Sequence, residues 1–156
     1  MPLDLLKSVL HNVGVVLVGF GVALIGRLID HLFGFHAFHS VLAQIAGSTL
    51  VASGVLLRVW ATDHFYRQRM KVISLEPQSA LIETGPYAFS RNPLYLGGNG
   101  FIFFGAGLLL GSPSALVLTA LHLPLVDLFI RREEKQLEQK FGPAWIAYEK
   151  RVRRWI

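Results

Sequence analysis

Three long stretches without a single Asp, Glu, Lys or Arg constrain this chain more than any other feature. They cover residues 8–26, 31–57 and 92–126 of a 156-residue sequence. A membrane-spanning helix needs about 20 mostly apolar residues, so each stretch is long enough to cross a bilayer. Charged residues make up only 16% of the chain, against about a quarter in soluble domains. We therefore expect an integral membrane protein of all-α fold rather than a soluble enzyme.

A turn signal divides the longest of these stretches into two segments. Gly111, Ser112 and Pro113 follow one another within it, and such a cluster ends a helix. We therefore predict four transmembrane helices, at residues 12–28, 41–60, 94–110 and 114–130, that form one polytopic helix bundle. The chain is then a single domain, residues 1–156, with the first two helices in 1–60, a loop in 61–93, a transmembrane hairpin in 94–130 and C-terminal helices in 131–156.

The distribution of Lys and Arg predicts how the bundle lies in the membrane. With four spans, 14 of the 15 basic residues fall on one side, and Arg27 alone falls near the other. Basic residues collect on the cytoplasmic side of membrane proteins, so both termini and the loop are expected to be cytoplasmic. The lipid bilayer is the expected partner, and no obligate protein partner is indicated.

The net charge of +5 does not indicate nucleic-acid binding. That function needs a basic face interleaved with exposed aromatic residues, whereas the basic residues here follow the predicted topology. The chain has no cysteine, which excludes a disulfide framework, a thiolate nucleophile and a Cys-ligated metal. His31, His36 and His39 share the short extracytoplasmic turn, but only Asp30 is an acidic residue near them, so no metal site is predicted.

The second half of the loop has the composition of an ordered, functional segment. Residues 79–98 are rich in apolar and aromatic side chains, and Gly85-Pro86 is a turn signal. Pro93 suits the first turn of the third span, which places Arg91 and Asn92 at the start of a helix. Free N–H groups, the helix dipole and the Arg91 guanidinium together favour binding of a carboxylate or phosphate. Alternatively, Asn92 is only the helix N-cap and Arg91 only a cytoplasmic anchor.

A second candidate segment lies where the fourth span leaves the membrane. At 3.6 residues per turn, one helix face carries Val126, Ile130, Glu133 and Leu137. Glu133 thus interrupts an apolar stripe, and a carboxylate that faces a packed interior is costly unless it is paired. We therefore treat Glu133 as a functional candidate, the alternative being a purely structural pair with Arg91 or Arg132.

Gly142-Pro143 ends this helix, and a last helix is predicted from Ala144 onward. One face of it carries an aromatic and apolar stripe formed by Trp145, Tyr148, Val152 and Trp155. Such a stripe is expected either to lie on the membrane surface or to fold over the loop. The basic residues near the carboxyl terminus are typical of an anchor for anionic headgroups.

The ordered set of motifs in the second half of the chain is similar to that of a known group of enzymes. The motifs are Gly85-Pro86-Tyr87, Arg91-Asn92-Pro93-Leu94-Tyr95-Leu96-Gly97, Arg132-Glu133-Glu134, Leu137, Phe141-Gly142 and Tyr148. In this respect the chain resembles the isoprenylcysteine carboxyl methyltransferase and phospholipid (phosphatidylethanolamine) N-methyltransferase superfamily of integral membrane enzymes. The resemblance covers roughly residues 71–156, while the first two spans match only in being hydrophobic.

The resemblance implies an integral membrane methyltransferase that uses S-adenosylmethionine, yields S-adenosylhomocysteine and acts on a lipidic or lipophilic membrane acceptor. A phospholipid amine and a prenylcysteine carboxylate are two such acceptors. It also implies a bacterial inner membrane and a cytoplasmic cofactor pocket that contains Ser79, Ala80, Leu81, Ile82, Tyr87, Asn92, Pro93, Leu94, Tyr95 and Glu133. Arg91, Glu133 and Glu134 are the polar groups whose loss should impair catalysis, and Arg131 or Arg132 would face the substrate.

One residue departs from the pattern of the carboxyl methyltransferases, which usually have His where this chain has Asn92. That departure weakens the assignment of a prenylcysteine acceptor. Two other functions stay open on the same scaffold: a nicotinamide-dependent membrane reductase related to sterol reductases, and a non-catalytic membrane adaptor.

Overall fold

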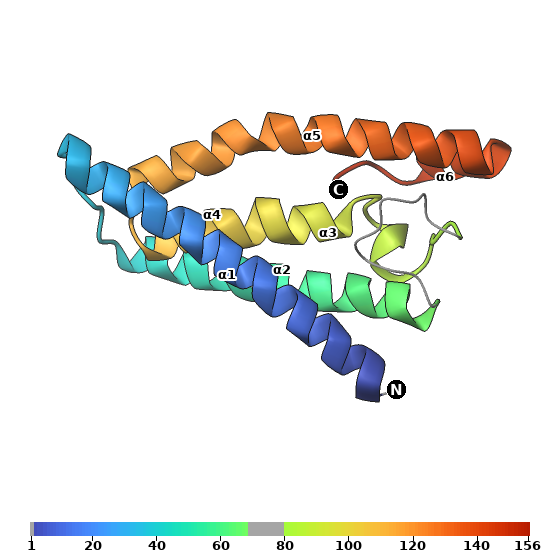
Figure 1. Ribbon diagram of the computed structural model, residues 1–156, viewed down its shortest axis with the longest axis horizontal. Coiled ribbons are helices and arrows are strands. Elements are labelled where there is room, and N and C mark those ends of the chain that lie inside the picture. Colours follow the sequence, from blue (N-terminus) through green and yellow to red (C-terminus); the bar gives the residue numbers. More distant parts are fainter. Residues whose placement is uncertain (1, 69–79) are drawn as a thin grey trace.

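The computed structural model describes residues 2–68 and 80–156 of the chain (Figure 1). Within these residues the fold is helical and contains no strand, which confirms the predicted all-α class. A 3₁₀ turn, η1, precedes the third span, and a π-helix, η2, lies inside it. The elements in chain order are α1 (Pro2–Phe33), α2 (Val41–Arg67), η1 (Gly85–Ala88), α3 (Pro93–Tyr95), η2 (Leu96–Ile102), α4 (Phe103–Leu109), α5 (Pro113–Phe141) and α6 (Pro143–Arg151).

Three helices are long and apolar enough to cross a membrane, namely Val9–Phe33 within α1, Val41–Arg67 and Pro113–Phe141. Pro93–Leu109 is a shorter apolar helix that lies where the third span was predicted. Together these segments make the chain an integral membrane protein with about four membrane helices. Figure 1 shows the amino terminus and α6 toward the same end of the bundle. The cytoplasmic location of that end stays a prediction.

Three of the predicted spans are parts of longer helices in the structure. The first, at residues 12–28, lies within α1, which runs from Pro2 to Phe33. α2 continues to Arg67, and α5 passes through residue 130 without a break and ends at Phe141. The apolar pattern marked only part of each helix, whereas residues 131–141 are mostly Glu, Lys, Arg, Gln and Leu, which are good helix formers. α5 ends at Gly142, whose φ of 52° lies in the left-handed region that favours glycine. The fourth span and the charged segment up to Phe141 are one helix, which confirms the helical face predicted across residue 130 and the helix end predicted at Gly142.

The third span lies at the centre of the bundle. Its segments η2 and α4 contact both α1 and α2, and α4 also contacts α5. Glycines let the backbones come close. A Cβ at Gly54 would lie 2.5 Å from the carbonyl oxygen of Gly97, and a Cβ at Gly26 would lie 2.4 Å from the backbone nitrogen of Ala115. Small residues at helix crossings are typical of membrane bundles, where close packing holds the helices together.

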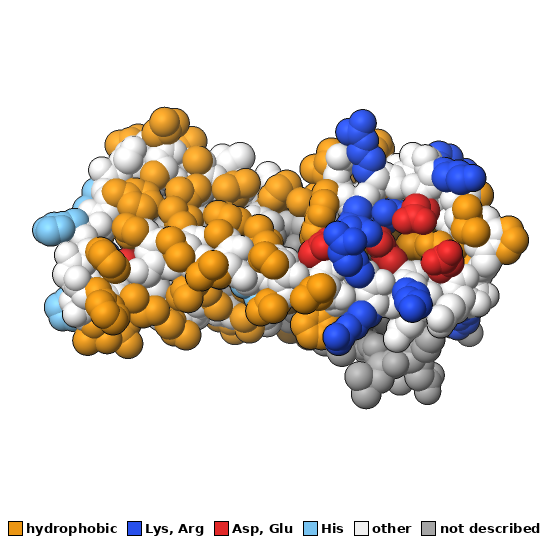
Figure 2. All heavy atoms as spheres, turned by 90° about the horizontal axis from the view of Figure 1, so that it is seen from above, with side chains coloured by type: hydrophobic (Ala, Val, Ile, Leu, Met, Phe, Trp, Pro, Cys, Tyr) orange, Lys and Arg blue, Asp and Glu red, His pale blue; other side chains and the backbone are white. Residues whose placement is uncertain are grey.

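The outer surface of the bundle divides into an apolar half and a charged half. Exposed large apolar side chains on α1, α2 and α5 include Leu17, Leu24, Leu42, Leu56 and Leu121. In Figure 2 hydrophobic side chains cover one half of the visible face, while Lys, Arg, Asp and Glu gather on the other. A bilayer would surround the apolar half, so the charged half lies at the membrane border.

A buried carboxylate fastens the end of the bundle that lies away from α6. Asp30, 1% exposed, accepts hydrogen bonds from Ser112 Oγ at 2.5 Å and from the backbone N–H of Ser114 at 3.0 Å. Ser112 Oγ itself accepts a hydrogen bond from the N–H of Ala115 at 3.1 Å and so caps α5. These contacts tie the end of α1 to the start of α5.

We expect Asp30→Ala to lower the free energy of unfolding by about 2 kcal/mol, because two hydrogen bonds to a charged group are lost. Denaturant unfolding in detergent micelles measures the change. The matched control is Asp63→Ala, which removes only an i,i+4 pair with Arg67, an arginine that is 59% exposed. The control should change stability by less than about 0.5 kcal/mol. Equal losses in the two variants would contradict the role given to Asp30.

Candidate active site

A cavity of about 600 Å³ lies where the apolar bundle meets its charged end. Side chains from α1, α2, η1, the third span, α5 and α6 all line it, so every major part of the fold contributes. Its volume falls within the range of about 300–1,000 Å³ that is usual for small-molecule and cofactor sites. This cavity is the candidate active site.

Most of the residues predicted for the site line this cavity. They come from two segments about 40 residues apart in the sequence, the end of the loop and the charged part of α5. The structure brings together Tyr87, Arg91, Asn92, Pro93, Leu94, Tyr95, Glu133 and Glu134. The two segments were expected to meet, and in the structure they face the same space.

Other predicted site residues lie elsewhere. Ile82 is buried in a core cluster against which Ala80 packs, and Leu81 packs against a second cluster that includes residues of α6. Arg131 and Arg132 are exposed and do not line the cavity, and Arg131 Nε binds Asp127 at 2.6 Å. Ser79 lies outside the described residues. Cofactor or substrate binding by these residues stays a prediction.

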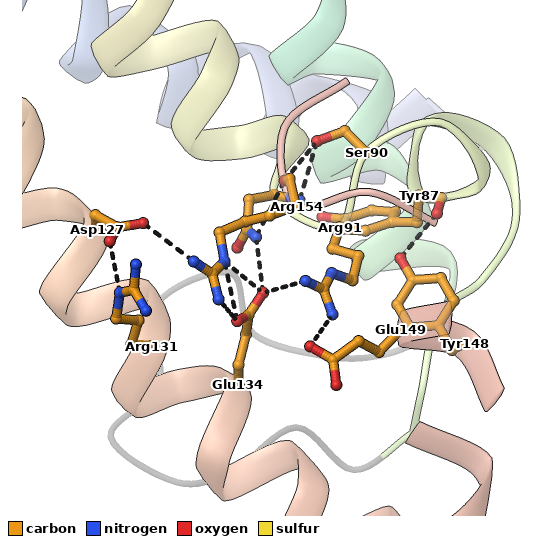
Figure 3. A network of polar contacts seen from close by, with 10 residues as sticks. Tyr87, Ser90, Arg91, Asp127, Arg131, Glu134, Tyr148, Glu149 and Arg154 are labelled. Carbon is orange, nitrogen blue, oxygen red and sulfur yellow. Dashed lines mark hydrogen bonds and ion pairs between the residues drawn. The ribbon is translucent and has the colours of Figure 1, made fainter. Parts of the chain in front are cut away.

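Glu134 is the centre of a network of ion pairs (Figure 3). This carboxylate is 7% exposed, and its Oε2 lies 2.6 Å from Arg154 Nη2 while its Oε1 lies 3.4 Å from Arg91 Nη2. Arg91 Nη1 also contacts Glu149 Oε1 at 2.5 Å. Hydrogen bonds to Glu134 raise the pKa of Arg154 above its ordinary value. Both arginines are therefore already neutralised by carboxylates.

The carboxyl-terminal tail is part of this network rather than a free anchor. The carbonyl oxygen of Arg153 accepts a hydrogen bond from the N–H of Arg91 at 3.0 Å. The carbonyl oxygen of Arg154 accepts from Ser90 Oγ at 3.2 Å and from Asn92 Nδ2 at 3.3 Å. Asn92 occupies the N-cap position of α3, but its side chain does not cap the helix. The amide instead holds the tail in place, and the predicted headgroup-binding role does not fit Arg154.

α6 ends at Arg151, so Val152 and Trp155 of the predicted aromatic stripe lie beyond the helix. The remainder of the stripe folds over the loop, which was one of its two predicted positions. Trp145, Tyr148 and Val152 form a buried cluster with Leu137 of α5. Tyr148 also donates its hydroxyl proton to the carbonyl oxygen of Tyr87 at 2.8 Å. α6 thereby closes one side of the cavity and fixes the position of η1.

Glu133 differs from its neighbour in having no cationic partner among the residues that the structure describes. It is half-buried, lines the cavity and accepts one hydrogen bond, from the Tyr95 hydroxyl at 3.2 Å. The purely structural alternative, a pair with Arg91 or Arg132, is not found in the described parts of the chain. The cavity thus contains a carboxylate that no described cation neutralises.

Tyr87 supplies a second group without a partner. Its hydroxyl is buried and makes no hydrogen bond within the described structure, although the residue lines the cavity. Burial raises the pKa of Tyr87 well above its ordinary value, with further contributions from Tyr148 and Glu133. The hydroxyl therefore stays protonated at physiological pH and is available as a donor to a ligand.

Several cavity residues were not predicted from the sequence. These are chiefly His11, Arg58, Phe65, Asn99, Phe103 and Trp145. Two of them could have been predicted from the sequence. His11 and Asn99 interrupt otherwise apolar stretches, and polar groups at such positions are often functional. Arg58 was used only as a marker of topology. No three His, Cys, Asp or Glu side chains that could hold a metal ion come together in residues 2–68 and 80–156.

The helical bundle of this membrane protein has an apolar outer half and a ligand-sized cavity lined by charged side chains. The family model described as phospholipid methyltransferase matches residues 42–144, more than half of the chain. The protein belongs to this family of membrane methyltransferases. No curated protein and no solved structure matches the chain.

Proposed function

We propose that this protein transfers a methyl group from S-adenosylmethionine to a lipidic or lipophilic acceptor at the membrane surface. The observation that carries the proposal is the cavity itself. Its lining combines the Glu133 carboxylate, which has no cationic partner among the described residues, with apolar side chains of the membrane bundle, in a chain that belongs to the phospholipid methyltransferase family. The cavity therefore offers charged side chains to the cofactor and apolar side chains to the acceptor.

The polar side chains of the cavity fit the chemistry of the cofactor. S-adenosylmethionine supplies a methyl group from a cationic sulfur, and it carries an ammonium and a carboxylate at its amino acid end. The carboxylate of Glu133 suits a cationic group, because the structure describes no other cation beside it. Arg91 is less suited to the cofactor carboxylate than expected, since Glu134 and Glu149 already bind it. The Tyr87 hydroxyl is a donor that remains available.

Apolar side chains of the same cavity suit an apolar acceptor. Val15 and Val18 of α1 and Phe103 of α4 line the cavity. Val18 is 57% exposed, so the cavity reaches the apolar outer surface of α1. In methyl transfer the bond from sulfur to the methyl carbon breaks, its electron pair stays on sulfur, and the acceptor atom forms the new bond. The protein's part in such a displacement is to position the reactants and exclude water.

Calorimetric titration of the purified protein in detergent micelles tests this proposal. We expect S-adenosylmethionine and S-adenosylhomocysteine to bind saturably at one site per chain, and NADPH not to bind. Transfer of a labelled methyl group into a membrane lipid extract should then follow. Binding of NADPH alone would instead support the reductase. No binding of either cofactor by the folded protein, with or without added lipid, would support a non-catalytic adaptor.

A further inference from the structure

Arg58 is a buried cation without an acidic partner among the described residues. It is 7% exposed and lines the cavity from α2. In the described part of the chain its guanidinium donates to two neutral groups, from Nε to Asn12 Oδ1 at 2.8 Å and from Nη1 to the carbonyl oxygen of Leu94 at 2.5 Å. Arg91, the other arginine that lines the cavity, is bound by two carboxylates. Arg58 thus brings a positive charge to the cavity that no described carboxylate neutralises.

The surroundings of Arg58 keep its guanidinium in a fixed position. A Cβ at Gly97 would lie 2.8 Å from Arg58 Cγ, and a Cβ at Gly98 would lie 2.9 Å from Nη1. Both glycines belong to η2, and π-helical segments of this kind often occur at functional sites. On the other side, Asn12 Nδ2 donates to Thr62 Oγ1 at 3.0 Å, which turns Asn12 Oδ1 toward Arg58. The fold therefore makes room for the guanidinium and orients it.

The fixed positive charge of Arg58 favours binding of an anionic ligand. A buried guanidinium without a counter-charge is unfavourable, and charged residues within membrane helices usually mark sites of substrate or ion binding. The planar fork of arginine matches the two oxygens of a carboxylate or phosphate. A ligand that carries such an oxyanion would supply the missing negative charge.

The rest of the cavity near α1 indicates what the oxyanion is attached to. Val15, Val18 and Phe103 line the cavity together with Arg58, and Val18 extends to the apolar outer surface. Building on the proposed function, we infer that Arg58, oriented by Asn12, binds the phosphate or carboxylate of the methyl acceptor, which is therefore an anionic amphiphile. Arg58 is thus a substrate-binding residue that selects the class of acceptor by its charge.

Binding of short amphiphiles to the full chain in dodecyl maltoside micelles tests this inference. The probes are octyl phosphate, octanol and inorganic phosphate, each titrated by calorimetry. In the wild type, octyl phosphate should saturate one site per chain and bind at least tenfold more tightly than either octanol or inorganic phosphate. In Arg58→Gln its affinity should fall at least tenfold, while that of octanol stays the same.

The matched control is Arg67→Gln, the same substitution on the same helix. Arg67 is 59% exposed, pairs with Asp63 and does not line the cavity, so this variant should bind octyl phosphate as the wild type does. Equal affinity of the wild type for octyl phosphate and octanol would overturn the inference, even if Arg58→Gln fails to fold. Unchanged affinity in folded Arg58→Gln would also overturn it. Equal binding of inorganic and octyl phosphate would show that no amphiphile is selected.

Titration of the same samples with S-adenosylhomocysteine separates this inference from the proposed function. We expect Arg58→Gln to keep its affinity for S-adenosylhomocysteine. If the variant loses that affinity and still binds octyl phosphate, Arg58 belongs to the cofactor site, and the inference fails while the function stands. If the wild type binds octyl phosphate but no adenosyl compound, the function fails and the oxyanion site stands.

Discussion

Glu133→Gln is expected to weaken the binding of S-adenosylhomocysteine by about 10- to 100-fold, because a hydrogen bond to a charged group contributes about 1.5–3 kcal/mol. The substitution keeps the shape of the side chain and removes only its charge. Glu133 accepts one hydrogen bond from Tyr95 and has no cationic partner in the described structure. Its loss therefore breaks no ion pair, and the unfolding temperature of the protein without ligand should stay the same or rise.

Calorimetry with S-adenosylhomocysteine and thermal unfolding without ligand measure these two effects. Glu138→Gln is the matched control, because Glu138 is exposed on the same helix and does not line the cavity. It should change neither the affinity nor the stability. An unchanged affinity in Glu133→Gln would remove Glu133 from the cofactor site. A large loss of stability would show that its role is structural.

Glu134→Gln is expected to have the opposite profile, with a free energy of unfolding about 3 kcal/mol lower than that of the wild type. Breaking a buried ion pair leaves its partner charge uncompensated, which costs about 3–5 kcal/mol; we take the lower limit because the side chain of Arg154 is 24% exposed. Arg91 and Arg154 would then face each other without the carboxylate that separates them. Activity should fall as well, because the tail and the helix start lose their common partner.

A double-mutant cycle between Glu134 and Arg154 measures this coupling by denaturant unfolding in micelles. The cycle uses Glu134→Gln, Arg154→Gln and the double variant, and we expect an interaction free energy above about 1 kcal/mol. The control cycle is the i,i+4 pair of Asp63 and Arg67, in which the arginine is 59% exposed, and about 0.3–0.5 kcal/mol is expected for it. Equal coupling in the two cycles would contradict a central role for Glu134.

Glu133 and Glu134 show which properties of the site could be predicted from the sequence and which could not. The helical stripe singled out Glu133, and the resemblance to membrane methyltransferases added Glu134 as a second polar group. Both line the cavity, yet within the described structure Glu133 has no cationic partner while Glu134 binds two arginines. Neighbours on a helix point about 100° apart, so their partners come from different elements. Local spacing could not distinguish these environments.

The predictions for the loop show a similar division. Tyr87 and residues 91–95 line the cavity, because a turn and a helix start place them there. Ala80 and Leu81 pack into core clusters, and Ile82 is buried in one. Apolar side chains fit either a core or a pocket wall, so their chemistry alone does not decide between the two. The packing of α6 and α2 against the loop decides it.

The sequence by itself determined the membrane bundle, its approximate spans and the two segments that form the charged end of the cavity. These follow from local properties, namely the lack of charges over helix-length stretches, turn residues and helical periodicity. Only the tertiary structure decided which charges are neutralised. Arg154 and Glu134 are 20 residues apart, and Arg58 and Asn12 are 46 apart. Such partners meet only through helix packing. For that reason only the folded chain shows that, among the described residues, Arg58 has no acidic partner and Glu133 no cationic one.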